Sequence, residues 1–315
     1  MNKRILLPAF WTMFAAVIFA SVAIWYTLIK FPRQDGGRLV WETPELINKI
    51  TVEAPGETIT LLQENNTWVI KEADYYYADS AIINQLFNDL RQSSYFRRLP
   101  YSEQTLSQTG LDSSGTRLTI YQDDRLLKSM VIGKTAPNRD YRYARQPGSQ
   151  ELWLISGIWQ LPGEAYSWLL QPILEYPADI IEKVAFNRSG RKEEAARQSP
   201  HMPFLSERRP VLNLNGLLER FVFFIAEAVK SAQNFDEELY PNRRHIELTT
   251  FSGLITTIDL YYGNDEYWVK ISLSAAPLTT AGVNAYIRNN SFLYDGWYFK
   301  IPAVNGRILA QYKFN

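Results

Sequence analysis

The chain has 315 residues, equal numbers of basic and acidic side chains at 33 each, and no cysteine. The balanced charge provides no basic field that would attract nucleic acid, so nucleic acid is excluded as an expected partner. The lack of cysteine excludes disulfides, thiolate metal sites and a cysteine nucleophile.

The N-terminal segment from Ile5 to Ile29 contains no charged residue. As a helix with a rise of about 1.5 Å per residue, this segment is long enough to span the roughly 30 Å hydrocarbon core of a bilayer. Trp11 near one end, and Trp25 and Tyr26 near the other, lie where aromatic rings favour the membrane interface. We therefore predict a membrane anchor, consisting of an N-terminal tail and a transmembrane helix within residues 1–34.

A cleaved signal peptide is the alternative interpretation of the same segment. Lys3 and Arg4 form a positively charged start, and Ser21 with Ala23 forms a small-x-small pair. A cut after Ala23 would fall inside the apolar run, whereas a secretory apolar region normally ends before its cleavage site, so a retained anchor is favoured. The flanking charges nearly balance, and the short N-terminal tail is easily kept inside, so we expect the bulk of the chain outside the cytoplasm.

The chain contains a weak internal repeat at an offset of about 134 residues. The segment from Lys49 to Glu53 parallels the segment from Lys183 to Asn187, and Gly56 falls on Gly190. An apolar helical face recurs at the same offset, with Ile83, Phe87 and Leu90 against Leu217, Phe221 and Phe224. We predict two tandem repeats, at residues 38–177 and 178–315, of which the second is divergent.

Each repeat is predicted to contain three strands, a helix, four strands and a closing helix. In the first repeat, alternation of apolar residues predicts strands at Ile50 to Glu53, Thr58 to Gln63, Thr67 to Lys71, Leu118 to Gln122 and Leu126 to Ile132. Helical spacing predicts a helix capped by Ser80 and closing helices at Glu164 to Leu170 and Ala303 to Tyr312. Short connections between strands imply antiparallel sheets with helices packed on them, so the predicted fold class is α+β. The polar, proline-containing stretch from Arg188 to Pro210 predicts irregular structure.

Recognisable catalytic motifs are missing from the sequence, which has no P-loop, dinucleotide fingerprint, His-Glu-x-x-His or Gly-x-Ser-x-Gly pattern. The two histidines, His201 and His245, occur in different local contexts, and their spacing suggests no convergence on a metal or a catalytic triad. The acidic pairs lie in predicted turns, where Asp bonds to its own backbone. We therefore predict no catalytic, cofactor-binding or metal-binding residues, no cofactor and no enzymatic activity.

Two tyrosine-rich segments are candidates for contact with a partner or a ligand. The first contains Tyr75, Tyr76 and Tyr77, and the second presents Tyr141, Tyr143 and Arg145 on one face of a predicted strand. Tyr and Arg are enriched where proteins bind partners. Packing on the sheet is nevertheless the favoured interpretation of both segments. A concave aromatic pocket there would favour a ligand, and a flat patch would favour a partner protein.

The first repeat carries a series of short motifs in a defined order. These are Trp68-Val69 at the end of a strand, Gly110-Leu111 before a strand, Gly133-Lys134 in a hairpin, and Tyr141 to Arg145 before Leu152 to Leu154. In this order the chain resembles a bacterial domain family of unknown function, usually described as an auxiliary component of gliding-motility-type ABC transporters. The resemblance implies one N-terminal transmembrane helix and a duplicated extracytoplasmic domain. The second half lacks a Gly-Leu pair before Ile246.

The anchor and the resemblance together predict a non-enzymatic, membrane-anchored accessory subunit of a membrane complex, with an ABC-type transport system as the expected complex. They imply single-pass insertion in the bacterial inner (cytoplasmic) membrane, with most of the chain periplasmic or otherwise extracytoplasmic. The expected partners are integral-membrane transporter subunits with a separate ATPase, because this chain has no nucleotide-binding motif. The alternative is an envelope protein that binds or acts on glycans or lipids.

Overall fold

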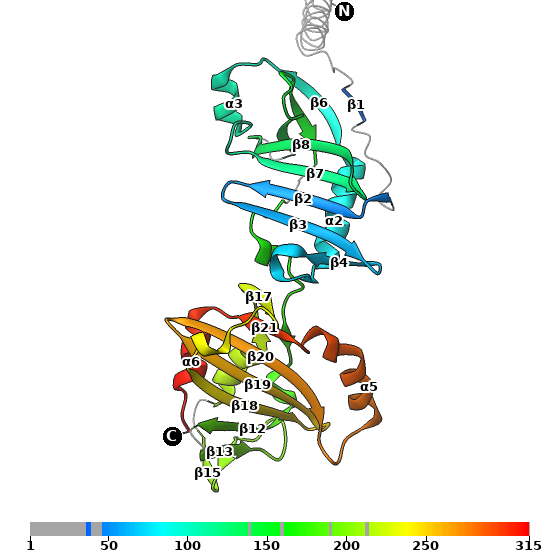
Figure 1. Cartoon of the computed structure of the whole chain (residues 1–315). Helices are drawn as coiled ribbons and strands as arrows, with labels where there is room; N and C mark the ends of the chain where they lie inside the picture. Colours follow the sequence, from blue (N-terminus) through cyan, green and yellow to red (C-terminus); the bar gives the residue numbers. More distant parts are fainter. Residues whose placement is uncertain are drawn as a thin grey trace, which may run out of the picture. The chain divides into compact units, whose positions relative to one another are not determined.

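The computed structural model describes residues 36–38, 46–137, 140–157, 161–188, 191–211 and 214–314. Strands account for most of the regular structure in this part of the chain, and they form two large antiparallel sheets and one two-stranded sheet (Figure 1). The two-stranded sheet pairs β11 (Leu174–Glu175) with β16 (Phe223–Phe224).

The first sheet has ten strands in the order β1-β6-β10-β9-β8-β7-β2-β3-β4-β5. These are β1 (Gly36–Arg38), β2 (Lys49–Ala54), β3 (Glu57–Glu64), β4 (Thr67–Ile70), β5 (Tyr76–Tyr77), β6 (Ser94–Leu99), β7 (Thr116–Gln122), β8 (Arg125–Thr135), β9 (Tyr141–Arg145) and β10 (Leu152–Ser156). Its helical elements are η2 (Lys71–Ala73), α2 (Ser80–Gln92), α3 (Glu103–Thr109) and η3 (Ala165–Trp168). In the hairpin β2–β3, the buried Ile50 and Val52 lie opposite the buried Leu61 and Ile59, as the apolar alternation predicts.

The second sheet has nine strands in the order β15-β14-β13-β12-β18-β19-β20-β21-β17 (Figure 1). These are β12 (Ile181–Arg188), β13 (Arg191–Ala196), β14 (Leu205–Ser206), β15 (Arg209–Pro210), β17 (Ala228–Ser231), β18 (Asn242–Thr250), β19 (Leu254–Gly263), β20 (Glu266–Ala275) and β21 (Trp297–Lys300). The accompanying helices are α4 (Leu214–Phe221), α5 (Ala281–Asn290) and α6 (Ala303–Gln311), with the short turns η4 (Ala178–Ile180), η5 (Glu237–Leu239) and η6 (Ser291–Leu293).

Nine strands of the first sheet have the same order as the nine strands of the second. When read from β5 and from β15, the orders are β5-β4-β3-β2-β7-β8-β9-β10-β6 and β15-β14-β13-β12-β18-β19-β20-β21-β17, and the first sheet continues with β1, which pairs with β6. In each, a meander is followed by a helix, by the strand at the other end of this common order (β6 or β17), and then by the strands between that strand and the meander. This common order is the one that a duplicated chain would have.

Contact density divides the chain differently, into two compact units built from interleaved segments. Of the described residues, one unit contains those within Leu86–Leu118 and Lys128–Gln160, and the other contains those within Glu45–Gln85, Thr119–Leu127 and Leu161–Asn315. The repeat boundaries at residues 38–177 and 178–315 therefore stay a prediction.

The predicted α+β class is wrong, because the described chain is mainly β-sheet. The expected closing helix at Glu164 to Leu170 is only the 3₁₀ turn η3, in which the Trp168 indole N–H donates to the carbonyl of Pro162 at 3.0 Å. The stretch from Arg188 to Pro210, expected to be irregular, forms the end of β12 and the strands β13, β14 and β15. For β13, β14 and β15, pairing with a neighbouring strand determined the structure more than local propensity did.

The cap of helix α2 also differs from the prediction. Asp79, and not Ser80, accepts the backbone N–H of Ala81 on its carboxylate at 2.7 Å, and Ser80 is the first helical residue. A carboxylate one position earlier satisfies a free N–H of the first turn equally well.

The predicted membrane anchor, with Trp11, Trp25 and Tyr26, lies outside the described residues. Among the residues that the structure describes, no helix has the length and apolar character needed to cross a bilayer. The assignment as a single-pass inner-membrane protein with a periplasmic bulk is therefore corrected.

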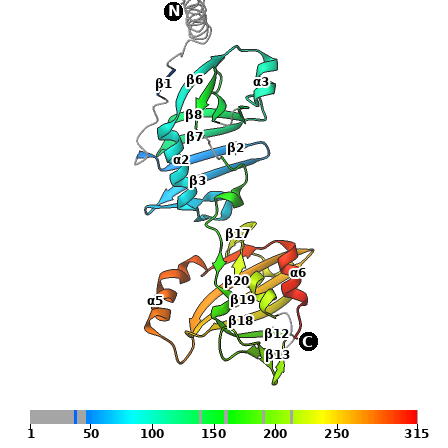
Figure 2. The same ribbon diagram turned by 180° about the vertical axis from the view of Figure 1, so that it is seen from behind.

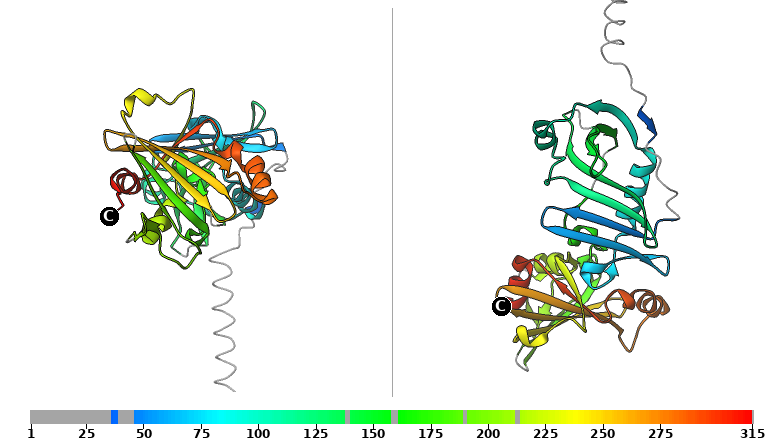
Figure 3. Two further views of the ribbon diagram at one scale, coloured as in Figure 1. Left: turned by 90° about the horizontal axis from the view of Figure 1, so that it is seen from below. Right: turned by 45° about the horizontal axis from the view of Figure 1, so that its top comes forward.

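One face of the second sheet is covered by helix α6, which crosses β19 and β20 (Figure 2). The long strands of this sheet lie side by side (Figure 3). Strands β18 and β19 alternate buried and half-buried positions along much of their length. Buried apolar side chains of this face include Ile246, Leu248, Ile258, Leu260 and Ile271. At the centre of the α6 contact, Gly306 packs directly on the buried Tyr267, and an added Cβ would lie 2.1 Å from its ring.

We expect Gly306→Ala to lower the free energy of unfolding by about 1 to 3 kcal/mol, because a methyl group there must displace either the Tyr267 ring or the helix. Urea denaturation followed by circular dichroism measures this change. The control is Gly216→Ala in α4, where an added Cβ meets nothing within 4 Å, so that helix propensity should stabilise the fold by up to about 1 kcal/mol. Equal stability of Gly306→Ala and wild type would refute this packing.

Candidate functional site

The second sheet presents a polar face on the side opposite to α6. Alternation places His245, Glu247, Asp259 and Lys270 on that face, between the buried residues of β18, β19 and β20. His245 Nδ1 lies 2.7 Å from an oxygen of Asp259, and its Nε2 lies 3.7 Å from Glu247. The two ring nitrogens therefore face different carboxylates, and the described residues contain no group of metal ligands.

The buried Arg244 holds the end of α6 against the same sheet. Its guanidinium donates to the carbonyls of Leu309 at 2.7 Å and Ala310 at 3.0 Å, and also to that of Tyr312. These are carbonyls at a helix C-terminus, which lack helical partners and favour a cation. The arginine thereby fixes the path of the chain beyond α6, and the ring of Phe314 packs edge-on to Phe186 of β12 at 5.3 Å.

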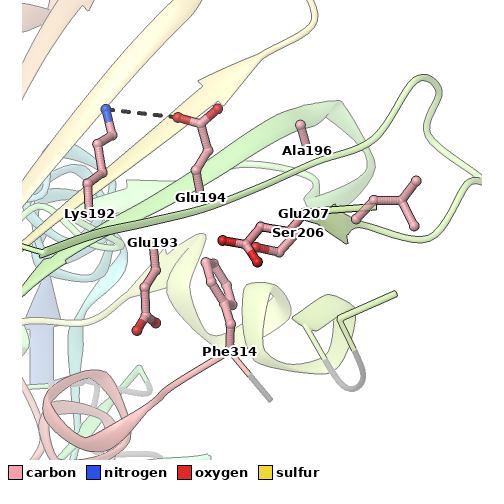
Figure 4. A pocket seen from close by; sticks show the side chains of 8 residues that line it. Lys192, Glu193, Glu194, Ala196, Ser206, Glu207 and Phe314 are labelled. Atoms are coloured by element: carbon pink, nitrogen blue, oxygen red, sulfur yellow. Dashed lines mark ion pairs between the residues drawn. The ribbon is translucent and has the colours of Figure 1, made fainter. Parts of the chain in front are cut away.

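A pocket of about 510 Å³ opens where β13, β14 and this C-terminal segment meet (Figure 4). It is lined by Lys192, Glu193, Glu194, Ala196, Leu205, Ser206, Glu207 and Phe314. Figure 4 shows the carboxylates of Glu193 and Glu207 on either side of the Phe314 ring, with Lys192 and Glu194 on the other side of the strand. All of these residues belong to one compact unit.

Among the described residues that line the pocket, the one cation, Lys192, is already paired. Lys192 Nζ lies 3.0 Å from Glu247 and 3.9 Å from Glu194, and Lys183 Nζ lies 3.7 Å from Glu194. The hydrogen bond to Glu247 raises the pKa of Lys192 and lowers that of Glu247, so both remain charged at neutral pH. With Lys192 occupied in this way, the side of the pocket around Phe314 is acidic.

A second cluster of polar chemistry lies at the β17 end of the sheet, on the polar face. Its core is aromatic and consists of Phe235, Tyr240, Tyr261, Trp268 and Tyr298. Glu237 accepts the Tyr298 hydroxyl at 2.6 Å and pairs with Arg243 at 2.8 Å. Glu266 accepts the Tyr240 hydroxyl at 2.7 Å and pairs with Lys300.

These bonds set the protonation states of the cluster. The Tyr298 hydroxyl lowers the pKa of Glu237, and Lys300 and Tyr240 lower the pKa of Glu266. Burial, followed by the neighbouring Glu266, raises the pKa of Tyr240 to about 12. Both carboxylates are therefore ionised acceptors at neutral pH, whereas a carboxyl that acts as general acid needs a raised pKa. This geometry indicates a structural role, in which the two carboxylates hold neighbouring elements together.

The structure buries one of the three residues of the first tyrosine segment. Tyr76 is buried, packs edge-on to Trp297 and Phe299, and donates its hydroxyl to the carbonyl of Leu293 at 3.2 Å. Tyr77 is half-buried, and Tyr75 is 46% exposed with a left-handed backbone, at φ +66°. Tyr75 thus lies in the turn before β5, and Tyr76 and Tyr77 form that strand, with Tyr76 in the core as the packing interpretation predicts.

The second segment, on β9, is also packed against its neighbours. Tyr141 stacks on Phe96 with ring centroids 4.3 Å apart, and Tyr143 packs on the buried cluster of Leu106, Leu111, Val131 and Leu152. The guanidinium Nε of Arg145 donates to the carbonyl of Leu111 at 2.7 Å. The two tyrosine segments belong to different compact units, and none of their residues lines the pocket at β13.

The sequence did not predict the residues that line the pocket. Glu193, Glu207 and Phe314 lie in stretches without apolar alternation, and the segment Arg191–Ala196 contains no β-branched residue. The one available signal was the paired charges, which a solvated loop would show equally well.

The comparison with known families bears on the central part of the chain. Residues 68–202 match the Domain of unknown function (DUF4340). The match begins in β4 and ends after β13, so it covers less than half of the chain. No curated protein and no solved structure matches. The expected relation to a family of unknown function is confirmed, and the DUF4340 match does not extend to the association with ABC transporters.

We expect Arg145→Met to lower the free energy of unfolding by about 1 to 3 kcal/mol, because it removes a partly buried bond to the carbonyl of Leu111. Chemical denaturation of the purified protein tests this. Arg125→Met is the control, since its bond to Gln122 is exposed and its loss should change stability by less than about 0.5 kcal/mol. Unchanged stability of Arg145→Met would favour a contact role for this strand.

Glu237→Gln should destabilise the protein in a pH-dependent way. A carboxyl whose pKa is lowered in the folded state stabilises the fold above its ordinary value of 4.5, and this contribution disappears as pH falls through the folded-state pKa. The stability difference between wild type and variant should thus be largest near neutral pH and shrink below about pH 4.5. Thermal melts across this range measure it, with the exposed Glu103→Gln as control. A difference independent of pH would contradict the assignment.

Proposed function

We propose that this chain is a non-enzymatic accessory subunit that works by binding other proteins of a larger complex. The observation that carries the proposal is the pocket at β13, where an acidic, half-open surface adjoins the edge of a large sheet. Such a surface offers backbone hydrogen bonds and charge to a partner. The proposed function is therefore the binding of partner proteins.

The state of the chemically active side chains supports the same proposal. Glu237 and Glu266 are engaged by tyrosines and cations, and His245 is held between two carboxylates. A general acid, a general base or a nucleophile needs a perturbed group that can reach a substrate. In the described part of the chain, Glu237, Glu266 and His245 instead bind side chains of neighbouring elements.

The complex that we propose is an ABC-type transport system, in which transporter subunits and a separate ATPase are the partners. This step rests on the resemblance of the motifs from Trp68 to Leu154 to the gliding-motility-type family. The DUF4340 match supports the family relation only at the level of an uncharacterised domain.

The proposal is tested by affinity purification of the full-length chain from its native host after mild crosslinking. We expect transporter subunits and an ATPase to be recovered in stoichiometric amounts. The double variant Glu193→Gln/Glu207→Gln should lose at least about tenfold of this recovery. Glu64→Gln/Glu103→Gln, which removes two exposed carboxylates elsewhere, should not. Recovery of the wild-type chain alone, or turnover of an envelope glycan or lipid by the purified protein, would overturn the proposal.

A further inference from the structure

The outer edge of β13 is largely unpaired. On one side β13 pairs with β12 over its whole length, from Arg191 to Ala196. On its other side the described strands provide a single partner position, Ala196 opposite Leu205 of β14. Beyond that position the β14–β15 hairpin does not pair with β13, and the pocket lies beside the edge that is left open.

The register shows which backbone groups point toward the pocket. The N–H of Arg197 donates to the carbonyl of Glu182 at 2.9 Å, which marks these two residues as a hydrogen-bonded pair. In an antiparallel ladder such pairs alternate with pairs whose N–H and C=O groups point away from each other. Counting back along β13, the backbone groups of Lys192 and Glu194 face away from β12 and toward the open edge.

The first sheet contains the same strand with its edge covered. Aligning the hairpins at their first pairs, Ala54 with Glu57 and Arg188 with Arg191, sets Glu194 at the position of Thr60. In β3 the N–H of Thr60 donates to the carboxylate of Glu72 in η2 at 2.7 Å, and β4 pairs with four further residues. The second sheet has the short β14–β15 hairpin where the first has β4 and η2.

We propose that the open edge of β13 binds an extended, basic segment of a partner protein as an added β-strand. The inference rests on the proposed function and names the partner's chemistry. Bare strand edges are templates for pairing, and proteins use them to capture peptides by main-chain hydrogen bonds. The segment supplies for β13 what β4 and η2 supply for β3.

The side chains beside the edge specify the composition of the segment. Glu193 and Glu207 flank the Phe314 ring on one face, and Glu194 lies on the opposite face (Figure 4). A bound strand alternates its own side chains between these faces. Basic residues at alternate positions reach Glu193 and Glu207 beside the Phe314 ring. The uncharged residues between them lie on the face of Glu194, whose carboxylate already pairs with Lys183 and Lys192.

The test uses a fluorescently labelled eight-residue peptide of alternating Lys and Val with blocked ends. We expect saturable binding to the full-length protein by fluorescence anisotropy. N-methylation of alternate peptide amides, which removes strand donors, should weaken binding at least about tenfold, and replacement of Lys by Glu should abolish it. Failure of the unmodified peptide to saturate at millimolar protein, or equal binding of the N-methylated peptide, would overturn the proposal.

Matched variants of the protein separate backbone from charge. Glu194→Pro removes an outward N–H without touching the β12 ladder and should weaken peptide binding about three- to tenfold. Glu194→Ala keeps that N–H and should have the smaller effect. Glu193→Gln/Glu207→Gln should lower both the affinity and its dependence on salt. Circular dichroism melts verify folding, and Ser272→Ala on the interior strand β20 is the neutral control.

Two further outcomes identify a wrong occupant or a wrong function. Concentration-dependent dimerisation that Glu194→Pro abolishes, without peptide binding, would assign the edge to a second copy of this chain and overturn the proposal. Stoichiometric transporter partners that Glu194→Pro retains would leave the accessory function standing and refute the edge. Peptide binding with no transporter partner would support the edge and refute the transport complex.

Discussion

The buried guanidinium of Arg244 is the interaction on which the second sheet and its pocket depend. It lies on the central strand β18 and engages three carbonyls at the end of α6. Leaving such buried carbonyls without a donor costs about 1 to 3 kcal/mol each. Because the same residue lies 4.5 Å from the ring of Phe186, the strand, the helix end and the C-terminal segment are held together at one point. This arrangement sets the position of Phe314, which forms one wall of the pocket.

The two large sheets differ in how the outer edge of the second meander strand, β3 or β13, is covered. In the first, β3 is protected by β4 and by the carboxylate of Glu72. In the second, β13 carries charged side chains and a short hairpin that pairs at one position. Charged residues on an edge discourage nonspecific association, while the open main-chain groups still permit a specific one.

The polar face of the second sheet shows how much charged chemistry a protein can use for structure alone. Glu237, Glu266 and His245 would each attract attention as catalytic groups in isolation. Their tyrosine, cation and carboxylate neighbours engage them and connect η5 with β21 and β18 with β19. Exposure limits what each pair contributes, but a connected network of this kind favours one register of the strands.

The sequence by itself determined the strands whose apolar residues alternate, such as β2 and β3, and the helix after Asp79. It also determined that Tyr76 and Tyr143 pack, since large aromatic residues beside strands bury their area. Only the tertiary structure decided that Arg191–Ala196 is a strand and that Glu193, Glu207 and Phe314 meet. The physical reason is that apolar alternation is a property of neighbouring residues and can be read from the sequence. Strand β13 has no such alternation and forms because it can hydrogen-bond to β12. A pocket between segments more than a hundred residues apart requires that the ladder, the helix and Arg244 are already in place.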